Sequence, residues 1–233
     1  MNHHQLAPIA IGGVGGSGTR LIAELISRFG YYIGSDLNEA SDNLWFTLLF
    51  KHLDILSYSD EKFSGLYSLF ARKMAGKHDI TESELSELTK LASLNRSLHS
   101  STWLNERVAS LASDEQHGTQ IKQWGWKEPN THVLLDRLNQ CSDHLKYIHV
   151  MRNGLEMAHS TNQNQLRLWG PHFLGTQQGL TTFHALKFWC VVHRRISLIG
   201  NSMGDRFLMV NYNSLCDNPS EELQRITRFV NSD

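Results

Sequence analysis

The sequence predicts an α/β protein, a three-layer sandwich in which helices cover both faces of a central parallel sheet. Two observations carry this prediction. An apolar run at Ile9–Ile11 leads through a glycine-rich turn into an amphipathic helix expected over 18–29, and a second apolar run at 146–151 is again followed by a turn and a helical pattern. Strands that alternate with helices in this way pair in parallel, because each helix returns the chain to the same end of the sheet.

The turn after the first expected strand contains five glycines between Gly12 and Gly18. Glycines let the backbone fold back with its N–H groups pointing inward, and the N-terminus of the next helix adds partial positive charge. The segment therefore predicts a phosphate cradle built from the amides of Gly15, Gly16, Ser17, Gly18 and Thr19 and from the hydroxyls of Ser17 and Thr19. The arrangement is like that of the P-loop nucleotide hydrolases, but Thr19 stands where their G-x-x-x-x-G-K-[ST] motif has lysine, so ATP or GTP is not indicated.

The following elements are expected in order. A short second strand at 31–34 precedes a polar loop at 35–43, which should lie at the ligand-binding edge of the sheet. Residues 44–111 have helical spacing throughout, with a capping box at Thr81 and Glu84. No linker separates this segment, so we expect one domain over 1–233 with a helical insert, about 44–116, acting as a lid or acceptor-binding subdomain. A strand at 123–129 ending at Pro129, a strand at 206–212 and helices at 181–203 and from 218 complete the pattern.

Composition narrows the class of protein. The net charge of −1 gives no argument for nucleic acid or a membrane surface as partner. The three cysteines are widely spaced and the histidines form no metal-binding pattern, so no metal is expected and the cysteines are interpreted as buried reduced thiols. The first residues do not resemble a signal peptide, and no apolar stretch approaches the roughly 18 residues of a membrane helix. A soluble, cytoplasmic protein is expected.

A second anion site is predicted at the end of the 146–151 strand. Arg152 follows that strand directly, at the edge where the glycine loop also lies, and Ser160 is expected on the early turns of the next helix. A guanidinium and a hydroxyl suit a second phosphate. A ligand with phosphate groups at both ends would bridge the two sites.

Together, these segments resemble the sulfotransferases that use 3′-phosphoadenosine 5′-phosphosulfate (PAPS). Residues 12–21 are similar to their 5′-phosphosulfate loop, residues 146–160 to their 3′-phosphate motif and residues 207–219 to their late strand, while Trp126–Pro129 resembles a Lys-x-Pro step of several carbohydrate and protein sulfotransferases. Two features depart from the family. Gly16 replaces a residue that is often basic, and the late Gly-x-x-Gly-x-x-Lys loop is not found before Asp233.

The resemblance implies transfer of a sulfuryl group to a hydroxyl or amine by in-line displacement, without a metal. It implies that residues 15–19 hold the 5′-phosphosulfate, that Arg20 and Lys127 stabilise the leaving oxygen, and that Arg152 and Ser160 bind the 3′-phosphate. Four residues are candidates for the general base, and the sequence does not rank them: Glu39, Asp42, Glu128 and His132. Glu128 is alternatively the ion-pair partner of Lys127. A small molecule or a carbohydrate is the expected acceptor, and no oligomeric state is indicated.

Two other functions remain open at this point. An ATP-dependent P-loop kinase would need lysine at position 19 and an acidic residue after a neighbouring strand to hold magnesium, whereas the sequence has Thr19 and Arg152. A nucleotide-binding module that has lost its catalytic activity is supported by Gly16, which stands in place of a basic residue.

Overall fold

The sheet consists of four parallel strands in the order β2-β1-β3-β4. In the computed structural model, which describes residues 7–77, 79–113, 121–175 and 179–232, these strands are β1 (Ile9–Gly13), β2 (Gly125–Lys127), β3 (Lys146–Met151) and β4 (Phe207–Asn211). β1 lies inside the sheet between β2 and β3, and all four carboxyl ends reach the same edge. The predicted parallel α/β sheet is confirmed.

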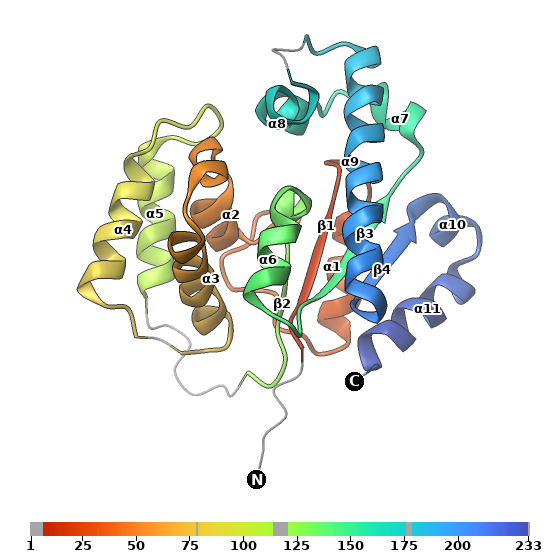
Figure 1. Ribbon diagram of the computed structural model, residues 1–233. Coiled ribbons are helices and arrows are strands. Elements are labelled where there is room, and N and C mark those ends of the chain that lie inside the picture. Colours follow the sequence, from red (N-terminus) through yellow and green to blue (C-terminus); the bar gives the residue numbers. More distant parts are fainter. Residues whose placement is uncertain (1–6, 78, 114–120, 176–178, 233) are drawn as a thin grey trace.

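Helices cover both faces of the sheet (Figure 1). On one face, α1 (Thr19–Arg28) and α11 (Pro219–Asn231) pack on the isoleucines of β1 and on Ile148. On the other face lie the 3-10 helix η2 (Pro129–Leu134), α6 (Leu135–Cys141) and α9 (Thr182–Met203), in contact with the larger hydrophobic core. Successive side chains of β1 point to opposite faces of the sheet, with Ile9 and Ile11 on one face and Ala10 on the other. The strand therefore packs against both helical layers. The predicted three-layer sandwich is confirmed.

The expected insert forms a helical lobe beside the β2 edge of the sheet (Figure 1). Its elements are α2 (Leu44–Phe50), η1 (Leu53–Ser57), α3 (Asp60–Met74), α4 (Glu82–Ser93) and α5 (Ser101–Ala112). The predicted capping box forms at the start of α4. Phe46 stacks on Trp126 of β2 with ring centroids 5.8 Å apart, so the lobe and the sheet share a hydrophobic core. The end of the insert, expected near residue 116, lies outside the described residues.

Two local predictions are wrong. Residues 31–34 do not form a strand: only Tyr32 pairs, in a single parallel bridge with Trp124, and the chain then turns at Gly34, whose φ is 115°. Ser160 does not lie on a helix either, because α7 (Gly154–Ala158) ends before it. The Ser160 hydroxyl instead accepts a hydrogen bond from the amide of Asn162, which stabilises a turn.

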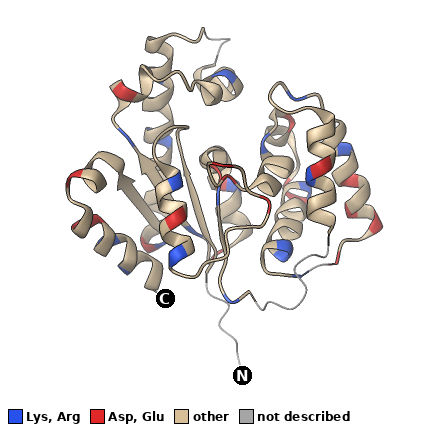
Figure 2. Ribbon diagram, turned by 180° about the vertical axis from the view of Figure 1, so that it is seen from behind, with Lys and Arg blue, Asp and Glu red and all other residues tan. Residues whose placement is uncertain are grey.

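The remaining helices are α8 (Asn164–Leu174), η3 (Gly204–Arg206) and α10 (Tyr212–Asp217). α8 and α10 lie at the carboxyl edge of the sheet, whereas η3 leads into the opposite end of β4. Lysines and arginines are interspersed with acidic residues along the helices (Figure 2). In the described part of the chain, we find no helix that combines the length and the apolar character needed to cross a bilayer.

Candidate active site

The glycine loop between β1 and α1 has the geometry of an anion cradle. Gly16 and Gly18 have φ values of 95° and 96°, which side-chain-bearing residues rarely adopt. No side chain of the described residues caps the N-terminus of α1. Ser17 is only 1% exposed, and its Oγ has no hydrogen-bond partner within the described ranges. Leaving such a hydroxyl unpaired costs about 1–3 kcal/mol, so the loop is built to receive a hydrogen-bonding ligand. The oxygens of a phosphate or phosphosulfate fit these donors.

Tyr212 connects the two predicted halves of the donor site. A Cβ on Gly18 would lie 2.2 Å from Cδ2 of Tyr212, so the ring occupies the space that a side chain there would need. The centre of the same ring lies 5.4 Å from the guanidinium carbon of Arg152. The structure therefore places Arg152 beside the glycine loop, with one aromatic ring between them.

Arg152 and the segment that carries Ser160 border the loop. Arg152 is half-exposed at the end of β3, where its Nε donates to Glu156 at 2.8 Å and its two terminal nitrogens have no partner in the described structure. A Cβ on Gly15 would lie 3.5 Å from Nδ2 of Asn162, two residues beyond Ser160. The ion pair with Glu156 still leaves the outer edge of the guanidinium available for a second phosphate.

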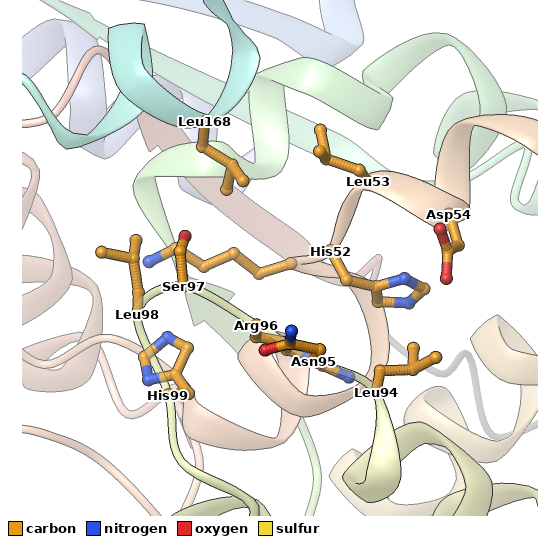
Figure 3. A pocket seen from close by; sticks show the side chains of 11 residues that line it. His52, Leu53, Asp54, Leu94, Asn95, Arg96, Ser97, Leu98, His99 and Leu168 are labelled. Atoms are coloured by element: carbon orange, nitrogen blue, oxygen red, sulfur yellow. The ribbon is translucent and has the colours of Figure 1, made fainter.

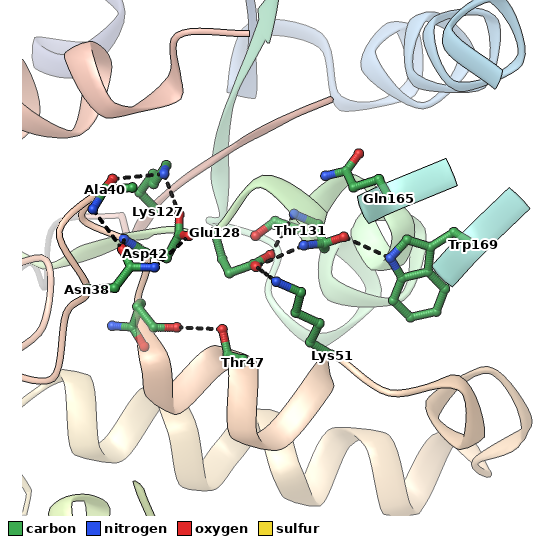
Figure 4. A network of polar contacts seen from close by, with 12 residues as sticks. Asn38, Ala40, Asp42, Thr47, Lys51, Lys127, Glu128, Thr131, Gln165 and Trp169 are labelled. Atoms are coloured by element: carbon green, nitrogen blue, oxygen red, sulfur yellow. Dashed lines mark hydrogen bonds and ion pairs between the residues drawn. The ribbon is translucent and has the colours of Figure 1, made fainter. Parts of the chain in front are cut away.

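Lys127 and Asp42, two of the predicted catalytic residues, are bonded to each other (Figure 4). Lys127 ends β2, and the exposed fraction of its side chain is 3%. Its ammonium donates to the carbonyl of Ala40 at 2.9 Å and forms an ion pair with the Asp42 carboxylate. Asp42 also accepts a hydrogen bond from Asn38 at 3.0 Å, so the polar loop clamps the lysine at the carboxyl edge of the sheet.

Glu128 does not pair with Lys127, and that alternative prediction is wrong. Its buried carboxylate lies 3.1 Å from Nζ of Lys51, which follows α2, and also accepts hydrogen bonds from the backbone amide and side chain of Asn130 (Figure 4). Burial lowers the pKa of Lys51, but the charges of Glu128 and Asp42 outweigh it and raise the pKa above its ordinary value. Sequence reasoning missed Lys51, because nothing in the motif around Glu128 indicates a partner so far away in the chain.

Of the other three candidates, two are exposed and one is completely buried. The Arg20 side chain is 63% exposed and its nearest carboxylate, Glu24, is 4.0 Å away. Glu39 lies exposed in the polar loop. His132 is completely buried, and burial, followed by the charges of Arg195 and His193, lowers its pKa to about 3 despite the hydrogen bond to Gln165. An imidazole so enclosed does not reach an acceptor.

Gln165, on α8, holds the start of the glycine loop and was not predicted. Its Nε2 donates to the carbonyl of Gly13 at 3.1 Å, and its Oε1 lies 3.1 Å from Nε2 of His132. Trp169 on the same helix donates to Asn130 at 2.8 Å. α8 therefore fixes both the loop after β1 and the segment after β2. Among the described residues we find no group of three or more histidine, cysteine or acidic side chains that is arranged to hold a metal.

Comparisons with known proteins identify the family of the chain. A family model described as the Sulfotransferase family matches residues 8–233, which confirms the resemblance seen in the sequence. No curated protein matches the chain. Among solved structures, the sulfotransferase domain of the Synechococcus PCC 7002 olefin synthase is 21% identical, with a TM-score of 0.48 over 100% of this chain and 76% of that one. Sulfotransferase STF1 of Mycobacterium tuberculosis is 13% identical, with a TM-score of 0.48 over 98% and 68%, and STF9 of Mycobacterium avium is 14% identical, with a TM-score of 0.46 over 98% and 64%.

Proposed function

This chain belongs to the sulfotransferase family, and we propose that it transfers a sulfuryl group from PAPS to a hydroxyl or amine of a small-molecule acceptor. The observation that carries this proposal is the glycine loop, with its unpartnered buried Ser17 hydroxyl, next to Arg152. A donor that has an anionic group at each end needs both the glycine loop and Arg152. ATP needs only the glycine loop, since it has no 3′-phosphate.

The donor would bind along the carboxyl edge of β1 and β3. In this proposal the amides of residues 15–19 and the hydroxyls of Ser17 and Thr19 hold the 5′-phosphosulfate. The free edge of the Arg152 guanidinium and the Ser160 hydroxyl, whose proton is not used in the turn with Asn162, hold the 3′-phosphate. These two residues would give selectivity for PAPS over ATP.

Transfer requires a cation where negative charge develops. The acceptor oxygen or nitrogen forms a bond to sulfur while the bond from sulfur to the bridging oxygen breaks, and the electron pair leaves with the nucleotide phosphate. We assign stabilisation of that oxygen to Lys127, because Asp42 and Ala40 already hold its ammonium in place at the edge of the sheet. Arg20 would add charge from the surface of α1. Asp42, Glu128 and Glu39 remain the proposed candidates for the general base.

Calorimetric titration with 3′-phosphoadenosine 5′-phosphate tests the donor site. We expect this bisphosphate to bind more tightly than ATP with magnesium, and Arg152→Ala to weaken it by about tenfold or more, since a charge-assisted hydrogen bond contributes roughly 1.5–3 kcal/mol. Glu156→Gln serves as the matched control, because it frees the guanidinium without removing it. Tighter binding of magnesium-ATP, or equal binding by Arg152→Ala, would overturn the proposal.

We also propose a single domain over 1–233, with the helical insert at 44–116, and a cytoplasmic location. The core shared by the sheet and the insert supports the single domain. The location is supported by Cys141, Cys190 and Cys216, which are free thiols, as expected in a reducing compartment. The prediction that these thiols are buried is wrong, because Cys190 and Cys216 are exposed and Cys141 is partly buried.

A further inference from the structure

A pocket of about 470 Å³ lies between the insert and α8 (Figure 3). We call it the insert pocket. The segment from Lys51 to Asp54, the connection at 94–99 and Leu168 of α8 line it. Four leucines supply its apolar surface: Leu53, Leu94, Leu98 and Leu168. Pockets of roughly 300–1,000 Å³ hold small molecules, so this one suits a compact ligand with an apolar body.

The insert pocket adjoins the donor site through two separate connections. Leu168 lies three residues after Gln165 on α8, less than one helical turn from the side chain that bonds the Gly13 carbonyl. Lys51 bonds Glu128, whose own amide donates to the carbonyl of Ile11 in β1 at 3.1 Å. The Lys51 end of the pocket therefore meets the sheet edge where the donor would lie.

Two cationic side chains, Lys51 and Arg96, lie at that end of the pocket, and Glu128 pairs with Lys51. Arg96 donates three hydrogen bonds to the carbonyls of Thr47, Leu48 and Leu91, and no carboxylate of the described residues lies within ion-pair distance of it. Burial, followed by the charges of Lys51 and Arg96, lowers the pKa of His99 to about 4. Asp54 is exposed and lies beside His52, on the side of the pocket away from His99 (Figure 3).

Among the described residues that line the insert pocket, Asp54 supplies the one carboxylate, and it lies on the side away from His99. The Asp42 carboxylate is bonded to Lys127, and Glu128 is bonded to Lys51. His52 lines the insert pocket, but burial and the charge of Arg96 lower its pKa to about 4, so it is a weak base like His99. An acceptor whose hydroxyl ionises readily does not need a strong base, because a nearby ammonium stabilises its anion.

We propose that the insert pocket binds the acceptor, and that the acceptor is a small molecule with an apolar body and an acidic hydroxyl of the phenol type. The inference rests on the proposed function. The leucines hold the apolar body, and the Lys51 ammonium meets the reacting oxygen. The hydroxyl releases its proton to water, and its oxygen then forms the bond to sulfur. The bond from sulfur to the bridging oxygen breaks, and its electron pair leaves with the nucleotide.

Two acceptors of the same shape test the hydroxyl. 4-Methylphenol and trans-4-methylcyclohexanol have the same skeleton but differ strongly in acidity, and methyl β-glucoside represents a sugar. With PAPS as donor, we expect kcat/KM for the phenol to exceed that of both other compounds by about tenfold or more. Equal or faster transfer to the saturated alcohol or to the glucoside would overturn the proposed class of acceptor.

A substitution that fills the pocket tests its location. Leu168→Trp should raise KM for 4-methylphenol by about tenfold or more, while the Kd for 3′-phosphoadenosine 5′-phosphate stays within about threefold. Leu198→Trp, on the exposed side of α9, is the matched control and should change neither value. If the unaltered protein does not bind the bisphosphate, the proposed function fails. If it binds and Leu168→Trp leaves KM unchanged, only the pocket inference fails.

The role of Lys51 needs a variant that leaves no buried charge unpaired, so we choose the double substitution Lys51→Met with Glu128→Gln. Without the ammonium, the acceptor hydroxyl ionises at higher pH. In the double variant, we expect the midpoint of the increase of kcat with pH to shift to a pH higher by about one unit or more. Glu128→Gln alone should not shift this midpoint to higher pH. A structural role for Lys51 would lower the rate without moving the profile, and that result would refute the assignment.

Discussion

Replacing Gln165 by leucine should destabilise the protein and weaken donor binding together. The side chain is buried and spans two elements, with hydrogen bonds of 3.1 Å both to the Gly13 carbonyl and to His132. Leucine occupies a similar volume but leaves the buried carbonyl and the imidazole N–H without this partner. Each unsatisfied buried group costs about 1–3 kcal/mol, so we expect the free energy of unfolding to fall by roughly 2–4 kcal/mol.

Urea unfolding at pH 7.5 measures this loss, and calorimetry with 3′-phosphoadenosine 5′-phosphate measures its effect on the donor loop. We expect the Kd to rise several-fold, because the carbonyl that precedes the loop is no longer held. Gln140→Leu, at an exposed position of α6, is the matched control, and its free energy of unfolding should stay within about 0.5 kcal/mol of that of the unaltered protein. If Gln165→Leu costs less than this control margin, or leaves the Kd unchanged, the reasoning about the bridge is refuted.

Three further predictions concern the loop and the buried histidines. Gly18→Ala should lower the free energy of unfolding in urea by about 2 kcal/mol or more, because the φ of Gly18 is 96° and Tyr212 fills the space for a Cβ. Gly65→Ala on α3, where a Cβ meets nothing within 4 Å, is the control and should raise it by roughly 0.5–1 kcal/mol. Equal effects of the two substitutions would contradict this prediction. Ser17→Ala removes a buried hydroxyl that has no partner among the described residues. Calorimetry should therefore show weaker binding of the bisphosphate, whereas urea unfolding should show no loss of stability. A large loss of stability would indicate that Ser17 has a structural role. Burial lowers the pKa of His132 to about 3 from an ordinary 6.5, so the unfolded chain takes up this proton at a higher pH than the folded protein does. The free energy of unfolding should therefore fall as the pH drops from 6.5 toward 3, by about 1.4 kcal/mol per pH unit for this group. Urea unfolding curves that coincide at pH 7.5 and pH 5 would refute this prediction.

The sequence predicted the parts of the proposed donor site that are local. The glycine turn, the helix after it and Arg152 at the end of β3 each depend on neighbours within a few residues, and all three form as expected. The strand at 31–34 failed for a local reason as well: Gly34 turns the chain after one bridging residue. Periodicity over four residues cannot reveal such a turn.

The pairing of charges was not predictable from the sequence. Lys127 and Glu128 are adjacent, and their side chains point to different partners because successive residues of an extended chain face opposite ways. Asp42 comes from the polar loop and Lys51 from the end of α2, so each ion pair depends on how the insert packs against β2. No short motif encodes that packing, and the same holds for Gln165, a lone polar residue in an otherwise ordinary helix.

The ring of Tyr212 against Gly18 has a consequence for the order in which the site is completed. The loop that would grip the donor is translated among the first twenty residues, yet the ring that packs on it belongs to α10, near the other end of the sequence. While β4 and α10 are still inside the ribosome, the folded part of the nascent chain lacks the Tyr212 ring that packs on Gly18. It also lacks β4, the strand that pairs with β3. Contacts between such distant segments form slowly, because a long loop must close first. Nucleotide affinity should therefore emerge during synthesis only after β4 and α10 have left the ribosome.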